Sequence, residues 1–184
     1  MDIIDTDILV VGAGPTGLVL SNILGAYGIE CILVEKNPST GKEPRAVSVD
    51  DESLRTLQAI GVTESFLPLV SKNYGSHYLS PAGKTFATVE PQLKTYGYYK
   101  RNGFDQPELE NILFKNLQKY NCVKIYFNST LTEIINKKKS IISHISRKRI
   151  PLSIQSKYVI ACDGGSSAIR KKIGINLKGL NFNE

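Results

Sequence analysis

The 184-residue sequence predicts an α/β fold: a Rossmann-like parallel sheet with helices, extended by an antiparallel β-meander and an incomplete second β layer. Two observations predict the parallel part. The apolar run "ILVV" (8–11) leads directly into the turn "GAGPTGL" (12–18), and a second apolar run, "CILVE" (31–35), follows a helical segment. A third observation predicts the antiparallel part, because short segments with alternating apolar and polar residues recur across 123–155.

The first unit is expected to be strand, glycine turn, helix and strand. Gly12, Gly14 and Gly17 have the spacing of a dinucleotide-binding turn. In such a turn the first glycine permits the tight bend, the second admits a pyrophosphate and the third lets the helix approach the strand. Pro15 fits the first helical turn, where its missing N–H is not needed. The apolar stripe expected along this helix is Leu20, Ile23, Leu24 and Tyr27.

Glu35 ends the second strand at about the distance from the glycine turn at which an acidic residue binds ribose hydroxyls. The alternative is an exposed carboxylate at a strand end. The loop that follows, 36–46, is longer than a simple connection from strand to helix needs. Loops of this length in a compact domain tend to be functional.

Three more helices are expected after this loop. The first covers about 49–60, with acidic residues in its first turn. The second starts at Asp105, which forms a capping box with Glu108. The last is capped by Ser166 and ends before Gly174.

The remaining segments predict strands. Residues 77–89 are expected to form a hairpin with Pro81, Ala82 and Gly83 in its turn, a feature with no place in a nicotinamide dehydrogenase. "YVIACDGG" (158–165) predicts another buried strand that ends in an acid and two glycines. The segments expected to form the meander are 123–127, 130–135, 140–146 and about 151–155.

Composition and charge exclude several classes of protein. The net charge is +6, but the basic clusters at 136–140 and 146–150 lack the interleaved aromatic residues that stack on bases, so no nucleic-acid partner is expected. No apolar run is long enough to span a membrane, and the N-terminus is acidic, which predicts a cytoplasmic protein without a membrane partner. The three cysteines show no CxxC spacing, so we expect buried thiols and no metal site.

Three of these features follow strands of the parallel sheet: the glycine turn, Glu35 and Asp163. Ligands of such sheets bind at the carboxyl ends of the strands, where the strand order reverses. A carboxylate flanked by glycines suits a sugar or ribityl hydroxyl, because it accepts hydrogen bonds while the glycines let the ligand approach. The residues alone therefore indicate a ligand longer than a mononucleotide and favour FAD over NAD only modestly.

Five stretches together resemble the flavoprotein aromatic hydroxylases, the single-component FAD monooxygenases of the para-hydroxybenzoate hydroxylase type. They are "GAGPTGL", "VEK", "PRAVSVDDESLRTLQAIGV", "RNGFDQPELE" and "ACDGGSSAIRKKIGI". Within that family the sequence is most similar to the 3-(3-hydroxyphenyl)propionate hydroxylases, in the same order along nearly the whole chain.

The resemblance implies a set of FAD-binding residues. It places Arg45 by the pyrophosphate, Gln106 near the flavin, and Asp163 at the ribityl chain with an influence on nicotinamide binding. It assigns no catalytic residue, and we interpret His77 and His144 as structural or exposed. The full set of expected cofactor-binding residues is Gly12, Gly14, Pro15, Thr16, Gly17, Glu35, Lys36, Arg45, Gln106, Asp163 and Gly164.

The resemblance also implies an activity. In that family NADPH or NADH reduces the flavin, O2 adds to form a flavin C4a-hydroperoxide, and one oxygen is transferred to a phenol ring, so the expected reaction here is hydroxylation of a phenolic aromatic acid. Residues 1–184 are then the FAD-binding, N-terminal portion of a longer hydroxylase fold, and 75–100 begins the insertion that belongs to the substrate domain. A homo-oligomer, or a partner chain that supplies the missing half, is compatible with this resemblance. Two alternatives stay open: a non-catalytic FAD- or nucleotide-binding module, and a related FAD oxidoreductase that does not use oxygen.

Overall fold

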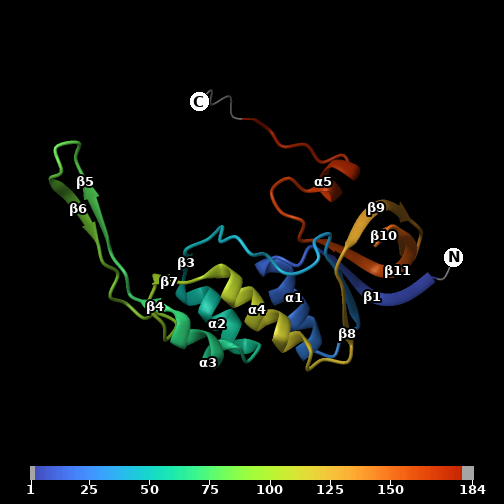
Figure 1. The fold of residues 1–184 in the computed structure, drawn as a ribbon, viewed down its shortest axis with the longest axis horizontal. Coiled ribbons are helices and arrows are strands. Elements are labelled where there is room, and N and C mark those ends of the chain that lie inside the picture. The colour runs from blue at the N-terminus through green and yellow to red at the C-terminus, as the bar shows by residue number, and fades with distance from the viewer. Residues whose placement is uncertain (1–2, 180–184) are drawn as a thin grey trace. The chain divides into compact units, whose positions relative to one another are not determined.

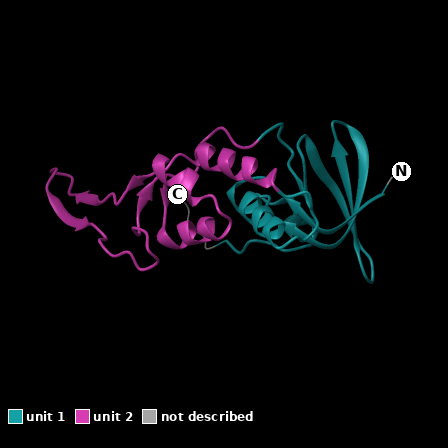
Figure 2. Cartoon of the chain, turned by 90° about the horizontal axis from the view of Figure 1, so that it is seen from below, with its two compact units in different colours: residues 1–39, 120–184 teal, residues 40–119 magenta. Residues whose placement is uncertain are grey.

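The computed structural model describes residues 3–179, and the chain divides into two compact units (Figure 2). Unit 1 is formed by residues 1–39 and 120–184, and unit 2 by residues 40–119. Within the described residues, no helix is both long and apolar enough to cross a membrane.

Unit 1 contains a six-stranded sheet in the order β8-β2-β1-β11-β10-β9 (Figure 1). The first four strands run parallel, and β10 pairs antiparallel with both β11 and β9. The predicted parallel sheet with an antiparallel meander is therefore confirmed. The strands are β1 (Ile3–Val11), β2 (Cys31–Val34), β8 (Val123–Tyr126), β9 (Ser129–Asn136), β10 (Ile141–Arg147) and β11 (Ile150–Ala161).

Two expectations about these strands are wrong. The segment 123–127 was expected in the meander, but β8 is a parallel edge strand beside β2. The segments 151–155 and 158–165 were expected as two strands, but β11 is one strand of twelve residues. Polar residues 155–157 interrupt the apolar pattern without ending the strand, because ladders to β1 and β10 flank this stretch of β11.

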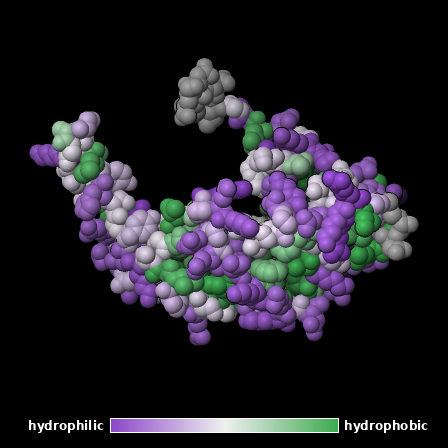
Figure 3. Space-filling view, in the orientation of Figure 1, coloured by the Kyte–Doolittle hydropathy of each residue, from purple (hydrophilic) through white to green (hydrophobic). Residues whose placement is uncertain are grey.

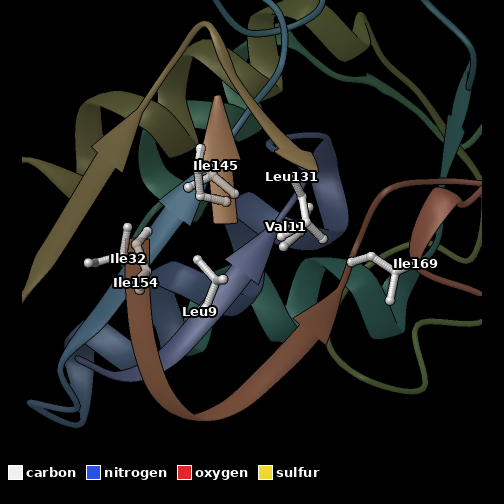
Figure 4. Packing of buried hydrophobic residues seen from close by; sticks show 8 residues of the cluster. Leu9, Val11, Ile32, Leu131, Ile145, Ile154 and Ile169 are labelled. Carbon is white, nitrogen blue, oxygen red and sulfur yellow. The ribbon is translucent and has the colours of Figure 1, made fainter. Parts of the chain in front are cut away.

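An apolar cluster in unit 1 joins the sheet to α5 (Ala168–Lys172), as Figure 4 shows. Leu9 and Val11 are two residues apart on β1, so both side chains point to the same face of the sheet. This packing fixes the strands whose carboxyl ends form the site described below. The buried residues of the cluster are Leu9, Val11, Ile32, Val34, Leu131, Ile145, Ile154 and Ile169.

The buried face of helix α1 (Pro15–Ala26) agrees only in part with the expected stripe, because Leu24 is buried whereas Leu20 and Ile23 are half-buried. Tyr27, expected on the apolar stripe, is 79% exposed. Small residues make the close contacts instead: a Cβ on Gly25 would lie 2.5 Å from the Tyr120 ring. The helix packs too tightly for a stripe of large side chains to face inward throughout. Its buried residues are Gly17, Leu18, Ser21, Asn22, Leu24 and Gly25.

Unit 2 contains most of the helices. They are α2 (Asp51–Ala59), α3 (Thr63–Phe66), the 3₁₀ helix η1 (Leu67–Leu69) and α4 (Gln106–Leu117). Asp50 caps α2 by accepting a hydrogen bond from the Ser53 N–H at 2.8 Å. Asp105 is at the N-cap of α4, but its side chain makes no cap hydrogen bond with a described residue, so the expected capping box is wrong.

Two small sheets complete unit 2. One has the order β3-β7-β4, from β3 (Ser48–Val49), β7 (Asn102–Gly103) and β4 (Ser71–Lys72). The other is the predicted hairpin, β5 (Ser76–Leu79) with β6 (Thr85–Val89). In Figure 1 the hairpin extends away from the helices of its own unit, and Figure 3 shows hydrophobic atoms on it beside hydrophilic ones. Its assignment to a substrate domain stays a prediction.

Candidate nucleotide-binding site

The carboxyl ends of three parallel strands meet at one edge of the unit 1 sheet. The Gly12 N–H, after β1, donates to the Val34 carbonyl at the end of β2 at 2.8 Å. The Cys162 N–H, after β11, donates to the Val11 carbonyl at 2.7 Å. Because the chain leaves β1 for β2 on one side and returns as β11 on the other, this edge is a switch point of the kind at which nucleotides bind.

The three glycines of the turn at this edge have two different roles. Gly12 has φ +106°, and a Cβ there would lie 2.3 Å from the Cys162 carbonyl oxygen. A Cβ on Gly17 would lie 1.9 Å from the Gly12 carbonyl oxygen. Gly14, by contrast, has φ −75° and nothing within 4 Å of the place a Cβ would take. Gly12 and Gly17 are therefore required by the fold, whereas Gly14 leaves open space.

The open space lies at the N-terminus of α1, which is electropositive. Gly14 is the N-cap, Pro15 and Thr16 form the start of the first turn, and no acidic side chain is present in that turn. No described side chain caps this end of the helix. Free first-turn amides and the helix dipole favour an anion here. The cradle therefore fits the pyrophosphate of a dinucleotide.

Glu35 lies directly beside this turn. Its carboxylate accepts a hydrogen bond from the Ala13 N–H at 2.8 Å and from the Asn37 N–H at 2.9 Å. A carboxylate has about four lone-pair positions, so two amides leave acceptor capacity for the hydroxyls of a ribose. The next residue, Lys36, is exposed. The predicted ribose-binding role of Glu35 has a suitable geometry, and it stays a prediction.

Replacing Glu35 with alanine is expected to weaken FAD binding by about 1.5–3 kcal/mol, the value of a hydrogen bond to a charged group. Titration of the chain with FAD, followed by flavin fluorescence, measures the change. Glu30→Ala, which removes an exposed acid just before β2, is the matched control. An affinity equal to that of the control would assign Glu35 to the fold alone.

Asp163 binds its own loop in this structure. One carboxylate oxygen accepts from the Ser167 hydroxyl at 2.6 Å and the other from the Ile169 N–H at 3.1 Å. Partial burial acts to raise the pKa of Asp163, but these hydrogen bonds outweigh it and hold the pKa below the usual 3.8. Gly164, with φ +81°, lets the chain turn between Asp163 and these two hydrogen-bond donors.

The same loop corrects the expected cap of the last helix. The Ser167 hydroxyl, not that of Ser166, accepts from the Arg170 N–H at 3.0 Å and caps α5. The Ser167 N–H donates to the Gly164 carbonyl at 3.0 Å, and its hydroxyl donates to Asp163. The turn at Gly164 and the Asp163 carboxylate therefore place Ser167, the second of the two serines, at the cap of α5.

Asp163→Asn is expected to lower stability by an amount that depends on pH. Because the pKa of Asp163 is lowered by folding, its carboxylate stabilises the folded state fully above pH 3.8, and this contribution is lost as pH falls through the folded-state pKa. Thermal unfolding of both proteins at about pH 6 and about pH 3 tests this. The difference in Tm should shrink at the lower pH, and an equal difference at both would contradict it.

Two predicted residues, Arg45 and Gln106, lie in unit 2. Gln106 is 6% exposed, and its side-chain oxygen accepts from the N–H groups of Arg45 at 3.0 Å and Ala46 at 2.9 Å. Its amide nitrogen donates to Glu110 at 2.7 Å. Arg45 itself is exposed. Gln106 thus fixes the backbone of the loop that carries Arg45.

Glu110 is the residue that sequence reasoning missed. It is 2% exposed, and its second carboxylate oxygen accepts from the Gly41 N–H at 2.7 Å. A signal was present in the sequence: Gln106 and Glu110 are four residues apart and share the buried face of α4 with Leu109 and Leu113. Polar residues at the spacing of an apolar stripe indicate buried hydrogen-bonding groups.

A separate hollow of about 410 Å³ lies on the meander. It shares no residue with the glycine turn, Glu35 or Asp163. Its lining residues are Thr132, His144, Ile145, Ser146, Arg149, Pro151 and Leu152. His144, interpreted from the sequence as structural or exposed, is 3.0 Å from the Ser153 hydroxyl through Nδ1. Across residues 3–179, no group of three or more metal-ligating side chains is brought together.

Comparison with known families shows the family to which the chain belongs. Residues 5–182 match a family model described as an FAD binding domain. The chain belongs to this FAD-binding family. The glycine turn, with its open position at Gly14, and Glu35 lie within the residues that this family model matches.

Relatives of this FAD-binding domain include hydroxylases that act on aromatic acids. The chain is 34% identical over 176 residues to the 3-(3-hydroxy-phenyl)propionate/3-hydroxycinnamic acid hydroxylase of Comamonas testosteroni, over 95% of this chain and 30% of the relative. It is 31% identical to the enzyme of the same name from Shigella sonnei, over 94% of this chain and 31% of the relative. The chain thus spans about 30% of the length of these relatives.

Solved structures confirm the fold. The FAD-binding domain superposes on p-nitrophenol 4-monooxygenase PnpA from Pseudomonas putida DLL-E4 with a TM-score of 0.89 and 25% identity, covering 98% of this chain and 46% of that one. The flavin-dependent monooxygenase PieE, solved with FAD and substrate, gives a TM-score of 0.85 at 21% identity, covering 96% of this chain and 33% of that one. At 21% identity the likeness to PieE concerns the fold alone.

Proposed function

We propose that the chain binds FAD at the carboxyl edge of the unit 1 sheet. One observation carries this proposal: the turn between β1 and α1 is closed at Gly12 and Gly17 but open at Gly14, beside a helix N-terminus. Such a turn admits a pyrophosphate and supplies amides to it. Glu35 then takes the ribose hydroxyls, and Asp163 with Gly164 borders the ribityl chain.

We further propose that the enzyme containing this domain hydroxylates a phenolic aromatic acid, using O2 and either NADPH or NADH. The relatives named 3-(3-hydroxy-phenyl)propionate/3-hydroxycinnamic acid hydroxylase support this activity, and one of them matches over 95% of this chain. FAD, when bound, supplies the redox and oxygen chemistry, and the protein supplies binding, orientation and exclusion of water. A cytoplasmic location and a homo-oligomer or partner chain stay predictions.

The first experiment is the visible spectrum of the purified chain, followed by titration with FAD if the protein is colourless. Bound flavin supports the proposed site. Absence of binding with excess FAD contradicts it.

A second experiment tests the activity. It measures the rate of NADH or NADPH oxidation and the oxygen uptake, each with and without 3-(3-hydroxyphenyl)propionate. Substrate-dependent oxygen uptake with a hydroxylated product supports a hydroxylase. Oxidation of NADH or NADPH with another electron acceptor and no oxygen uptake favours the oxidoreductase alternative. Bound FAD with no turnover favours the binding module.

A further inference from the structure

The hollow on the meander is a second candidate binding site of unit 1. It has a volume of about 410 Å³, and its lining residues belong to β9, β10, β11 and the turn between β10 and β11. Clefts of this volume hold small organic ligands in other proteins. The lining is mixed, because Pro151 and Leu152 are apolar whereas His144 and Arg149 carry polar groups. A ligand that fits it needs both an apolar part and a polar part.

The turn between β10 and β11 has an unusual sequence for its backbone conformation. Lys148 has φ +49° and Arg149 has φ +68°, and the residues on either side of them, Arg147 and Ile150, are paired. Two-residue hairpin turns with positive φ at both positions favour Asn-Gly or Asp-Gly, because most other side chains are strained there. Backbone strain of this kind is often found at binding sites. Two long basic side chains therefore occupy positions that the backbone conformation disfavours.

The three consecutive basic residues of this hairpin have different surroundings. Arg147 lies over the Tyr126 ring, with its Cζ 4.1 Å from the ring centroid. The Lys148 N–H donates to the Asn128 carbonyl at 2.9 Å, and Lys148 does not line the hollow. Arg149 does line it, and in the described part of the chain no acidic side chain is within ion-pair distance of its guanidinium. The Arg149 guanidinium is therefore available to an anionic ligand.

Other groups at the hollow also favour an anion. Lys172, from α5, donates from Nζ to the carbonyl oxygen of Thr132, a lining residue, at 2.6 Å. His144 Nδ1 is 3.0 Å from the Ser153 hydroxyl, so Nε2 is the ring nitrogen that remains for a ligand. Glu133, the Cα partner of His144 on β9, is acidic but does not line the hollow. Cationic side chains thus lie at the hollow without a carboxylate among its lining residues.

We propose that this hollow binds a small organic acid, that is, a carboxylate with an apolar body. Arg149 binds the carboxylate, because a planar guanidinium can form two parallel hydrogen bonds to such a group. The apolar body lies on Pro151 and Leu152. All lining residues belong to unit 1 and none belongs to the glycine turn, so this binding does not depend on FAD or on unit 2.

The test is titration of the chain with benzoate, followed by the backbone amide signals in NMR spectra. We expect saturable shifts at His144, Ser146 and Arg149 with a Kd of about 1 mM, the affinity of a small ligand at a partly open site. Benzamide retains the ring without the charge, and inorganic phosphate retains the charge without the apolar body. Each should bind about tenfold more weakly than benzoate, because each lacks one of the two kinds of contact.

Two variants with the same change in charge test the role of Arg149. Arg149→Gln removes the guanidinium and should weaken benzoate binding about tenfold, the loss of a hydrogen bond to a charged group. Lys148→Gln is the matched control, because it removes one positive charge from the same turn at a position that also has positive φ. It should change the affinity less than about twofold, since exposed charges that do not contact the ligand contribute little.

Each outcome decides the proposal. Saturable shifts at the hollow that weaken with Arg149→Gln but not with Lys148→Gln support it. Absence of saturable shifts at these residues overturns it, and so do equal losses from the two variants, which would indicate attraction by net charge alone. Benzamide or phosphate binding as tightly as benzoate overturns the assignment to an organic acid. The experiment contains no FAD, so failure of the proposed FAD binding leaves its result unchanged.

Discussion

Replacing Gly14 with leucine will abolish FAD binding and leave the fold in place. Gly14 has an ordinary φ of −75° and open space where a Cβ would be, so the Cβ of the new side chain meets no protein atom within 4 Å. It instead occupies the volume in front of the first-turn amides of α1. A pyrophosphate displaced from two such amides loses about 1.5 kcal/mol for each, so affinity falls by at least about 100-fold.

The measurement combines FAD titration with thermal unfolding. Loss of an N-cap glycine lowers stability by no more than about 1 kcal/mol, so the variant should unfold only slightly earlier than the parent chain. Stoichiometric FAD retained by a folded Gly14→Leu would falsify the assignment of this turn to the pyrophosphate.

Gly17→Ala has the opposite signature: it will destabilise the chain itself. Its single added methyl group would lie 1.9 Å from the Gly12 carbonyl oxygen and 3.3 Å from the Cys162 side chain. The oxygen belongs to the backbone of the turn, so relief requires α1 to move away from the sheet. Overpacking of this kind costs about 3 kcal/mol.

Urea denaturation of parent and variant gives this change in the free energy of unfolding. Gly165→Ala is the matched control, because a Cβ there meets nothing within 4 Å and its φ lies outside the left-handed region. Equal stability of the two alanine variants would contradict the close packing of α1 on the turn. The pair Gly14 and Gly17 thus separates binding from folding within one motif.

The sequence predicted the parts of the site that depend on local geometry. These parts are the glycine spacing, the acid at the end of β2 and the "DG" after β11. Each depends on a particular backbone conformation or on a strand end, which a short stretch of the sequence determines. The hairpin at 77–89 was predicted for the same reason, since turn residues act locally. The parallel sheet followed from continuous apolar runs.

Pairing partners and buried polar contacts could not be predicted in the same way. Whether 123–127 joins the meander or pairs beside β2 depends on which edge is free after the other strands have assembled. The inward face of α1 depends on how closely Gly17 and Gly25 let it approach Gly12 and Tyr120. Neither is encoded in the periodicity of the segment concerned.

The sequence by itself determined that this chain is an α/β protein with a dinucleotide turn, an acid after the second strand and an acidic glycine turn after a late strand. Only the tertiary structure decided that Gly14 is the open position, that Asp163 orders the start of α5, and that Glu110 and Gln106 hold a loop some 60 residues earlier in the chain. The physical reason is the sequence distance over which the two kinds of interaction act. Backbone conformation is fixed by neighbours in sequence, whereas empty space and buried hydrogen bonds exist only once distant segments are packed together.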